Sequence, residues 1–173
     1  MATRLVLVLV LVCAGVLAPA PATAEPVGPG ATALWVRPLP SGPVARPFQP
    51  PPSPYAAGHR GVDLAGAPGS PVLAAGDGVV VFAGMVAGRP VVSIDHADGL
   101  RTTYEPVDPS VAAGQPVARG SPIGTLLPGH AGCPAAACLH WGLRRGAIYL
   151  DPLSLLEVPR VRLLPVPPDD GRR

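Results

Sequence analysis

From residue 59 onward, short runs of apolar and β-branched residues alternate with turns that contain glycine. Runs of this length and composition, so closely spaced, are typical of strands in an antiparallel sheet. Between two of them, the pair Asp98-Gly99 favours a hairpin turn, because both residue types tolerate positive φ. The pattern predicts a mainly β, single-domain fold built on an antiparallel sheet. The predicted strands cover residues 71–75, 79–83, 89–95, 100–105, 115–118, 123–127 and 139–144.

The pattern is different before and after these strands. Residues 25–54 are rich in proline and glycine, including the run Pro50-Pro51-Pro52, and this composition favours extended backbone and resists helix. We expect an arm laid along the domain. After the strands, residues 153–157 are a candidate for a short C-terminal helix, with Asp151 placed to cap it and Pro152 in its first turn. The side chains expected to anchor the arm are Leu34, Trp35, Val36 and Phe48.

The first residues have the organisation of a secretory signal peptide. One arginine, Arg4, precedes an apolar run over residues 5–18, and small residues at Ala22 and Ala24 form an A-x-A cleavage site. The apolar run is short for a membrane span, which needs about 20 residues. We therefore expect cleavage after Ala24 and a secreted, extracytoplasmic protein without a stable membrane anchor; an uncleaved anchor is the alternative. The expected division is a signal peptide at 1–24, a proline-rich arm at 25–54, a β domain at 55–158 and a C-terminal tail at 159–173.

The composition constrains the class of partner. All thirteen basic residues are arginine, and the formal net charge is only +2 at pH 7. No basic stripe interleaved with aromatic residues is present, so the sequence does not indicate nucleic-acid binding.

Two cysteines remain once the signal peptide is removed, Cys133 and Cys138. An even pair in an exported chain usually forms a disulfide. A bridge between positions so close in sequence closes a small loop and stabilises the fold only modestly. A free Cys138 thiolate is the alternative.

Two short segments carry residues that can bind a metal. His59 and Asp63 stand close together in a glycine-containing segment, and an imidazole with a carboxylate suits zinc. In the last predicted strand, alternation places His140 on the open side and Leu139 with Trp141 in the core. Taken alone, each segment is better explained by a solvent-exposed histidine, with Asp63 capping a turn in the first.

Four sequence blocks follow one another between residues 59 and 156. They are residues 59–64 (HRGVDL), 69–72 with 75–80 (GSPV and AGDGVV), 92–96 with 99–104 (VSIDH and GLRTTY), and 139–142 (LHWG). In their order and spacing they resemble the lysostaphin/LytM-type, or β-lytic, zinc metallopeptidases.

This resemblance implies an antiparallel sheet with an open groove and one zinc ion at its floor. It implies that His59, Asp63 and His140 are the zinc ligands, which leaves one position for water, as in catalytic zinc sites. It also implies a substrate, the stem or cross-link peptides of bacterial peptidoglycan. Tyr104 and Arg144 are candidate substrate contacts in the groove.

The chain departs from the family at two catalytic histidines. Cys138 stands where the family has the first histidine of its H-x-H motif, and Pro106 stands where another histidine follows the tyrosine by two positions. Among the possible replacement bases we favour His130, because a bridge between Cys133 and Cys138 would hold its loop beside the metal. A solvent-exposed loop histidine is the alternative for His130. Glu105 is a second candidate base, although strand alternation points it to the opposite face unless Pro106 introduces a bulge.

Two functional hypotheses follow. The first is a secreted zinc endopeptidase that cuts peptide bonds of peptidoglycan, with His130 as general base. The second is a zinc-binding module of the same fold that binds peptidoglycan, or regulates another cell-wall hydrolase, without cleaving. The complete ligand set argues against a third, metal-free structural role. We place the first hypothesis ahead because His130 offers a replacement for the missing histidines.

Overall fold

The computed structural model describes residues 34–53 and 55–157. The expected signal peptide, the first part of the proline-rich arm and the expected tail lie outside the described residues. Within those ranges, no helix is long and apolar enough to cross a membrane.

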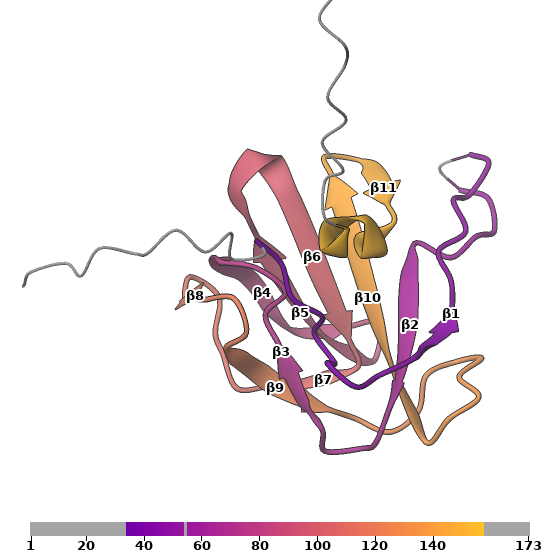
Figure 1. The fold of residues 1–173 in the computed structure, drawn as a ribbon, viewed down its shortest axis with the longest axis horizontal. Coiled ribbons are helices and arrows are strands. Elements are labelled where there is room, and N and C mark those ends of the chain that lie inside the picture. Colours follow the sequence, from indigo (N-terminus) through magenta and orange to yellow (C-terminus); the bar gives the residue numbers. More distant parts are fainter. Residues whose placement is uncertain (1–33, 54, 158–173) are drawn as a thin grey trace, which may run out of the picture. The chain divides into compact units, whose positions relative to one another are not determined.

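The described residues form two antiparallel sheets (Figure 1). The larger sheet has the strand order β1-β2-β10-β6-β5-β4-β8, with β11 also paired to β10, and the smaller sheet has the order β3-β9-β7. This is the mainly β, antiparallel architecture that the sequence predicts. The strands are β1 (Val44–Arg46), β2 (Gly61–Gly66), β3 (Pro71–Leu73), β4 (Gly78–Val86), β5 (Arg89–Asp95), β6 (Leu100–Glu105), β7 (Val107–Pro109), β8 (Pro116–Val117), β9 (Pro122–Leu126), β10 (Ala137–Arg145) and β11 (Ile148–Leu150).

The hairpin of β5 and β6 has the bounds that the sequence pattern predicts. A short 3-10 turn, η1 (Ala97–Gly99), joins the two strands. Asp98 and Gly99 adopt φ angles of 60° and 69°, the left-handed region that few other residue types enter readily. The Asp-Gly pair therefore locates this turn from sequence alone.

Four strands were not predicted: β1, β2, β7 and β11. The composition of β2 is not typical of a strand, because it has two glycines and the buried carboxylate of Asp63 and no run of β-branched residues. The three residues of β1 lie in the arm between Pro43 and Pro47. This strand is at the edge of the larger sheet, where neighbouring prolines cost the fewest hydrogen bonds.

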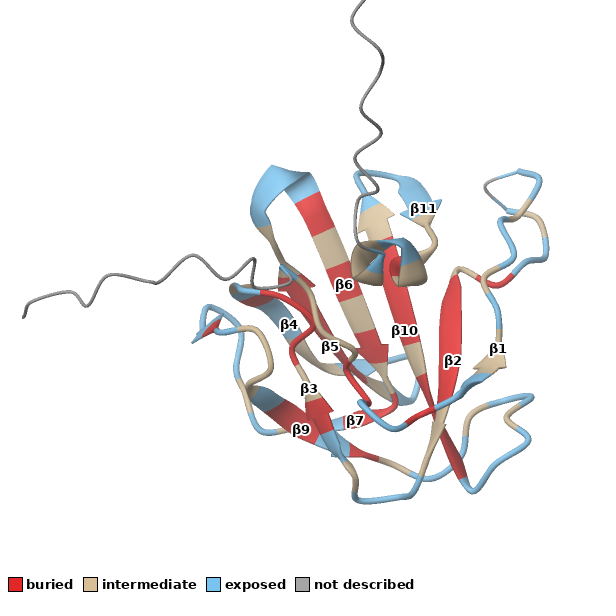
Figure 2. Ribbon diagram, viewed as in Figure 1, coloured by how far each residue is buried: buried red, intermediate tan, exposed pale blue. Residues whose placement is uncertain are grey.

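The hydrophobic core combines side chains of both sheets in one buried cluster. Its largest fully buried members include Trp141 and Tyr104, each without exposed surface. Figure 2 shows buried residues along β2 and β10, the two strands at the centre of the site described below. Within residues 137–143 of β10, every residue except the half-buried His140 is buried. Asp63 is fully buried on the neighbouring strand, so a charged group and a histidine interrupt an otherwise apolar region.

The arm is anchored by some of the residues expected from sequence. The backbone N–H of Val36 donates to the carbonyl of Ala75 at 2.8 Å. Trp35 packs so closely on Gly76 that a Cβ at position 76 would meet its ring at 2.6 Å. The expectation for Leu34 is wrong, because its side chain is 80% exposed; Leu39, buried at 5% exposure, anchors the arm instead.

The short C-terminal helix is η2 (Pro152–Leu156), a 3-10 helix. Its expected cap is present, since the Asp151 carboxylate accepts a hydrogen bond from the backbone N–H of Leu153 at 2.9 Å. Five residues with a proline near the start are too few for a stable α-helix, which explains the tighter form.

Candidate metal centre

One row of residues crosses four adjacent strands of the larger sheet. Arg46 on β1 pairs with Asp63 on β2, Asp63 pairs with His140 on β10, and His140 pairs with Glu105 on β6. Residues directly opposite one another in antiparallel strands project on the same face of the sheet. The register therefore gathers a carboxylate and an imidazole at the middle of the row, with charged residues at both ends.

His59 enters this row from the segment just before β2. Its backbone is fixed by two hydrogen bonds with Gln49, at 3.0 and 2.8 Å. Its Nδ1 lies 2.7 Å from the carbonyl oxygen of Pro47, so Nδ1 carries the proton and donates it to that carbonyl. In this tautomer Nε2 has a free lone pair, and it points to Asp63 Oδ1 at 2.9 Å.

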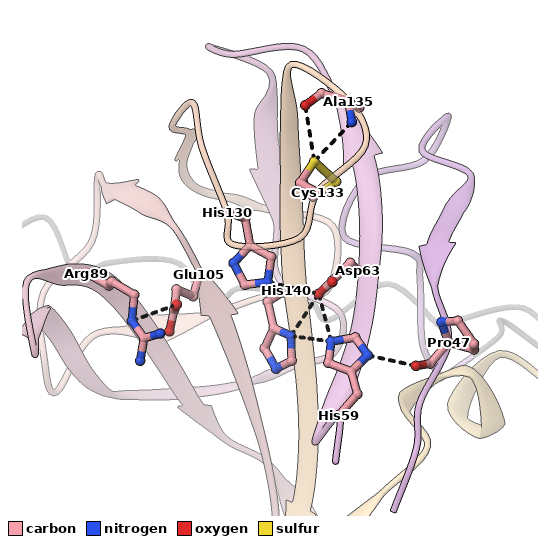
Figure 3. Close-up of polar contacts among 10 residues, drawn as sticks. Pro47, His59, Asp63, Arg89, Glu105, His130, Cys133, Ala135 and His140 are labelled. Carbon is pink, nitrogen blue, oxygen red and sulfur yellow. Dashed lines mark hydrogen bonds and ion pairs between the residues drawn. A yellow bond between two sulfur atoms is a disulfide. The ribbon is translucent and has the colours of Figure 1, made fainter. Parts of the chain in front are cut away.

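Three ligand-type atoms converge within this site (Figure 3). His59 Nε2, Asp63 Oδ1 and His140 Nδ1 are separated from one another by only 2.9, 2.9 and 3.0 Å. Zinc bonds of about 2.0–2.1 Å in a tetrahedron would separate such atoms by about 3.3 Å, so the three atoms need to spread by only a few tenths of an ångström. The second carboxylate oxygen of Asp63 is buried without a hydrogen-bond partner. Two imidazoles and a carboxylate around one point fit zinc.

Gly61 makes this convergence sterically feasible. A Cβ at position 61 would lie 2.8 Å from Nε2 and 2.9 Å from Cε1 of His140, and it would also collide with the carbonyl of Trp141. The His140 ring therefore lies against the bare backbone of β2. In the sequence this glycine indicates a loop or the start of a strand; its position between His59 and Asp63 is the signal that could have marked a close approach.

His130 reaches the same site from the loop that precedes β10. Its Nε2 is 3.3 Å from Asp63 Oδ1, and its ring stacks on that of His140 with centroids 5.6 Å apart. The ligand atoms of His59, Asp63, His130 and His140 all lie within 4.8 Å of one another.

A disulfide holds the loop that carries His130. Cys133 in the loop is bonded to Cys138 on β10, with their Cα atoms 5.7 Å apart. The backbone N–H of Cys133 donates to the carbonyl of His130 at 3.0 Å, so the bridged end of the loop is tied directly to the histidine. Gly129, next to His130, has a φ of 80°, which allows the loop to turn toward the sheet. The disulfide between Cys133 and Cys138 is thus present, and the loop that it closes places His130 beside Asp63, as the sequence predicts.

Asp63 is ionised within the site. Burial opposes the ionisation of Asp63, but hydrogen bonds from His130 and His140 outweigh it and hold the pKa of Asp63 well below its usual range. The hydrogen bond with Asp63 raises the pKa of His130, against the opposing effect of burial. Asp63 is therefore a carboxylate at neutral pH, as a metal ligand must be.

Other predicted site residues lie differently. Glu105 does not point away from the groove, because it lines the same hollow as the histidines. It is directly opposite His140 in the sheet, and residues that are directly opposite project on the same face. Its carboxylate is 3.0 Å from Nε of Arg89. Arg144 does not line this hollow; its guanidinium donates to the carbonyl of Gly146 at the far end of β10.

Tyr104 is part of the core and does not line the groove. It has no exposed surface, and its hydroxyl accepts hydrogen bonds from the backbone N–H of Ala75 at 3.0 Å and from Thr102 Oγ1 at 2.8 Å. Burial raises the pKa of Tyr104 to about 12. The expectation of a substrate contact is wrong, because strand alternation places residue 104 on the face opposite Glu105.

The hollow around the metal-type atoms has a volume of about 270 Å³. Arginines on its rim, which sequence reasoning did not single out, give it a positive charge. A larger hollow of about 420 Å³ near Leu39 contains none of the histidines and no titratable group. The residues lining the smaller hollow are Arg46, Gly58, His59, Arg60, Arg89, Glu105, His130, Ala131 and His140.

Comparison with known proteins agrees with this geometry. The sequence model of Peptidase family M23 matches residues 57–152. An uncharacterised protein of Mycobacterium tuberculosis is 51% identical over 161 residues, covering 90% of this chain and 62% of the relative. The chain thus spans less than two thirds of the length of this relative.

Two further relatives have described activities. The DD-carboxypeptidase/endopeptidase Mpg of Neisseria meningitidis is 34% identical over 98 residues, which cover 56% of this chain and 22% of that protein. Among solved structures, the catalytic domain of the antimicrobial peptidase lysostaphin from Staphylococcus simulans superposes with a TM-score of 0.52 and 25% identity. The superposition covers 61% of this chain and 81% of that domain.

Proposed function

Because the chain belongs to peptidase family M23, we propose that it is a zinc metalloendopeptidase that hydrolyses peptide bonds of bacterial peptidoglycan. The family and the fold support a peptidase-like role on peptidoglycan. We propose further that the protein is cleaved after Ala24 and acts outside the cytoplasmic membrane on stem or cross-link peptides.

The observation that carries the proposal is the convergence of three protein atoms. His59 Nε2, Asp63 Oδ1 and His140 Nδ1 lie within 3.0 Å of one another. In this role the three residues would hold one zinc ion per chain and leave a position open toward the hollow. When bound, zinc would supply Lewis-acid chemistry, acidifying water and polarising a peptide carbonyl.

His130 is the residue that we assign to proton transfer. Its hydrogen bond to Asp63 and its stacking on His140 fix the imidazole at the mouth of the site. Its side chain is 13% exposed, so it can meet both water and substrate. Held there by the loop and its disulfide, His130 would accept a proton from the attacking water and return it to the departing amine. The Pro47 carbonyl, through His59 Nδ1, keeps the His59 ring oriented throughout.

A second function is supported by a specific observation. Pro106 and Cys138 stand where the resemblance predicts two further catalytic histidines, and Cys138 is committed to the disulfide. A zinc-binding module that binds peptidoglycan, or regulates another cell-wall hydrolase, would need the ligands without the proton-transfer groups. The two proposals differ in His130, which only the enzyme requires.

Hydrolysis of purified peptidoglycan by the zinc-loaded protein tests the choice. The enzyme proposal predicts release of new amino groups, and a rate lower by about 10²–10⁴-fold for His130→Ala while one zinc per chain remains bound. His96→Ala is the matched control, since it removes a histidine that lies outside the hollow. Bound zinc without release of amino groups by the wild type would overturn the enzyme and favour the binding module.

A further inference from the structure

The hollow beside the metal-type atoms has a charge pattern that the proposed reaction does not use. Three arginines line it, Arg46, Arg60 and Arg89, against one acidic residue on its rim, Glu105. Asp63, the other carboxylate, is buried among the histidines. A positively charged hollow attracts anionic groups of a ligand, and guanidinium groups match carboxylates in shape.

Two of the three arginines are already engaged by the protein. Arg89 forms an ion pair with Glu105 at 3.0 Å. Arg60 donates to the carbonyl of Ala56 at 3.2 Å and lies over the ring of Tyr149, 5.5 Å from its centroid. These contacts fix both side chains at the rim and reduce what they can offer to a ligand.

Arg46 differs from both. Among the described residues, no ion pair or side-chain hydrogen bond involves Arg46, although its side chain is half-buried in the hollow. It stands on β1 directly opposite Asp63, one strand from the proposed ligand and two from His140. Adjacent strands lie about 4.8 Å apart, so the backbone of Arg46 is roughly 5 Å from that of Asp63 and roughly 10 Å from that of His140. An extended peptide covers that distance in about two or three residues.

The position of Arg46 is also fixed by the site itself. The next residue, Pro47, accepts the hydrogen bond from His59 Nδ1 at 2.7 Å. The strand that presents Arg46 is therefore tied to the histidine that begins the metal site. A ligand atom held by Arg46 would keep a fixed distance from the reacting centre.

From this arrangement we propose that Arg46 binds a carboxylate of the substrate, within about three residues of the bond that is cut. This inference rests on the proposed function and names its substrate class, a peptide with a negative charge close to the scissile bond. The carboxylate is either the free C-terminus of the peptide or the side chain of an acidic residue. Both would meet the same guanidinium.

Three synthetic pentapeptides distinguish the two sources. The parent is acetyl-Ala-Gly-Gln-Gly-Ala-amide, the second replaces the amide by a free C-terminal carboxylate, and the third replaces glutamine by glutamate. Binding to ¹⁵N-labelled protein is measured by NMR titration, with and without zinc. The Nε–H signal of Arg46, assigned by its loss in Arg46→Gln, reports contact directly.

We expect one of the charged peptides to bind about tenfold more tightly than the parent and to shift the Arg46 signal. The preferred peptide identifies the source of the carboxylate. Arg46→Gln removes the preference, whereas Arg145→Gln, an equal charge change at the exposed end of β10, keeps it. Equal affinities for all three peptides, or a preference that survives in Arg46→Gln, would overturn the proposal.

The peptide-binding result can be distinguished from a failure of the proposed zinc site. Zinc content is measured on the same samples. A protein that binds zinc but has no carboxylate preference keeps the metal site and loses the role of Arg46. A protein that binds no zinc but prefers a charged peptide through Arg46 loses the enzyme and keeps the carboxylate site.

Discussion

Two clusters of polar residues in this domain contain histidine, and they differ in the groups that the ring nitrogens contact. In the first, His96 lies at the end of β5, with Asp77, Thr102 and Trp35 around it. In the second, His59, His130 and His140 surround Asp63. Each cluster combines imidazole with polar groups in a partly buried place, so residue types alone do not separate them.

The bonding of the ring nitrogens separates the two clusters. His96 Nδ1 lies 2.8 Å from the Asp77 carbonyl, and its Nε2 lies 2.6 Å from Thr102 Oγ1, so both nitrogens have protein partners. Burial, the largest effect, lowers the pKa of His96. Around Asp63, by contrast, Nε2 of His59 and Nδ1 of His140 converge on one shared carboxylate oxygen. Convergent ligand-type atoms, rather than the presence of histidine, mark the proposed metal site.

Removal of a proposed ligand gives the largest expected difference between the clusters. His140→Ala removes one of the three proposed zinc ligands, so hydrolysis stops. Zinc affinity falls by more than about 100-fold, the cost of losing a partner outside the ligand set. Competition with a chromophoric chelator measures the affinity. His96→Ala has unchanged zinc affinity; similar losses in the two variants would show that the clusters do not differ as described.

Opening the disulfide tests the second cluster without touching a ligand. The double variant replaces Cys133 and Cys138 by serine, so the loop of His130 loses the bridge that fixes it. The rate of hydrolysis is expected to fall, at most by the factor of about 10²–10⁴ expected for His130→Ala. Zinc content stays at one per chain. The unfolding free energy falls by about 2 kcal/mol, the entropic value for so short a loop.

The disulfide result depends on comparing rate with metal content. Wild-type hydrolysis by the double variant would mean that the loop is held by its other contacts. Loss of zinc together with rate would mean that the bridge supports the ligands and not only His130.

Gly61 offers a smaller, steric test of the same site. Gly61→Ala places a methyl group against the His140 ring, which must move away from Asp63, and zinc affinity falls by about 10–100-fold. Gly84→Ala on β4 is the matched control, since its Cβ would make only an ordinary contact with Phe82 at 3.4 Å. Isothermal titration with zinc compares the two; equal affinities would contradict the assigned packing of His140.

The smallest expected effect belongs to the first cluster. His96→Ala removes two hydrogen bonds and an edge contact with Trp35, whose ring centroid is 4.8 Å away. The unfolding free energy, measured with urea, is expected to fall by about 2 kcal/mol. Unchanged stability would mean that His96 has no structural role and would remove the contrast with the metal site.

The fold was predictable where strands have a strong local signal. The hairpin of β5 and β6 combines β-branched residues with an Asp-Gly turn, so its bounds follow from sequence. The strand β2 has no such signal, because Gly61 and Asp63 serve the site and lower its β propensity. The prolines of the arm predict extended backbone and give no sign of β1 or of a role for Arg46.

The candidate site was predictable in part for a similar reason. The two cysteines allowed the position of His130 to be anticipated, because a short bridge to the ligand strand leaves its loop little choice. The position of Glu105 could not be predicted, because it depends on which residue of β10 is opposite residue 105. That pairing, with His140, is set only when the sheet folds. Tyr104 was misplaced for the same reason.

The most direct test of the account is X-ray absorption at the zinc edge of the metal-loaded protein, together with its zinc content. We predict one zinc per chain with a first shell of nitrogen and oxygen atoms, including two or more histidines, and loss of this signature in His59→Ala. A protein that binds no zinc, or a zinc environment without histidine that is unchanged in His59→Ala, would contradict the proposed metal site.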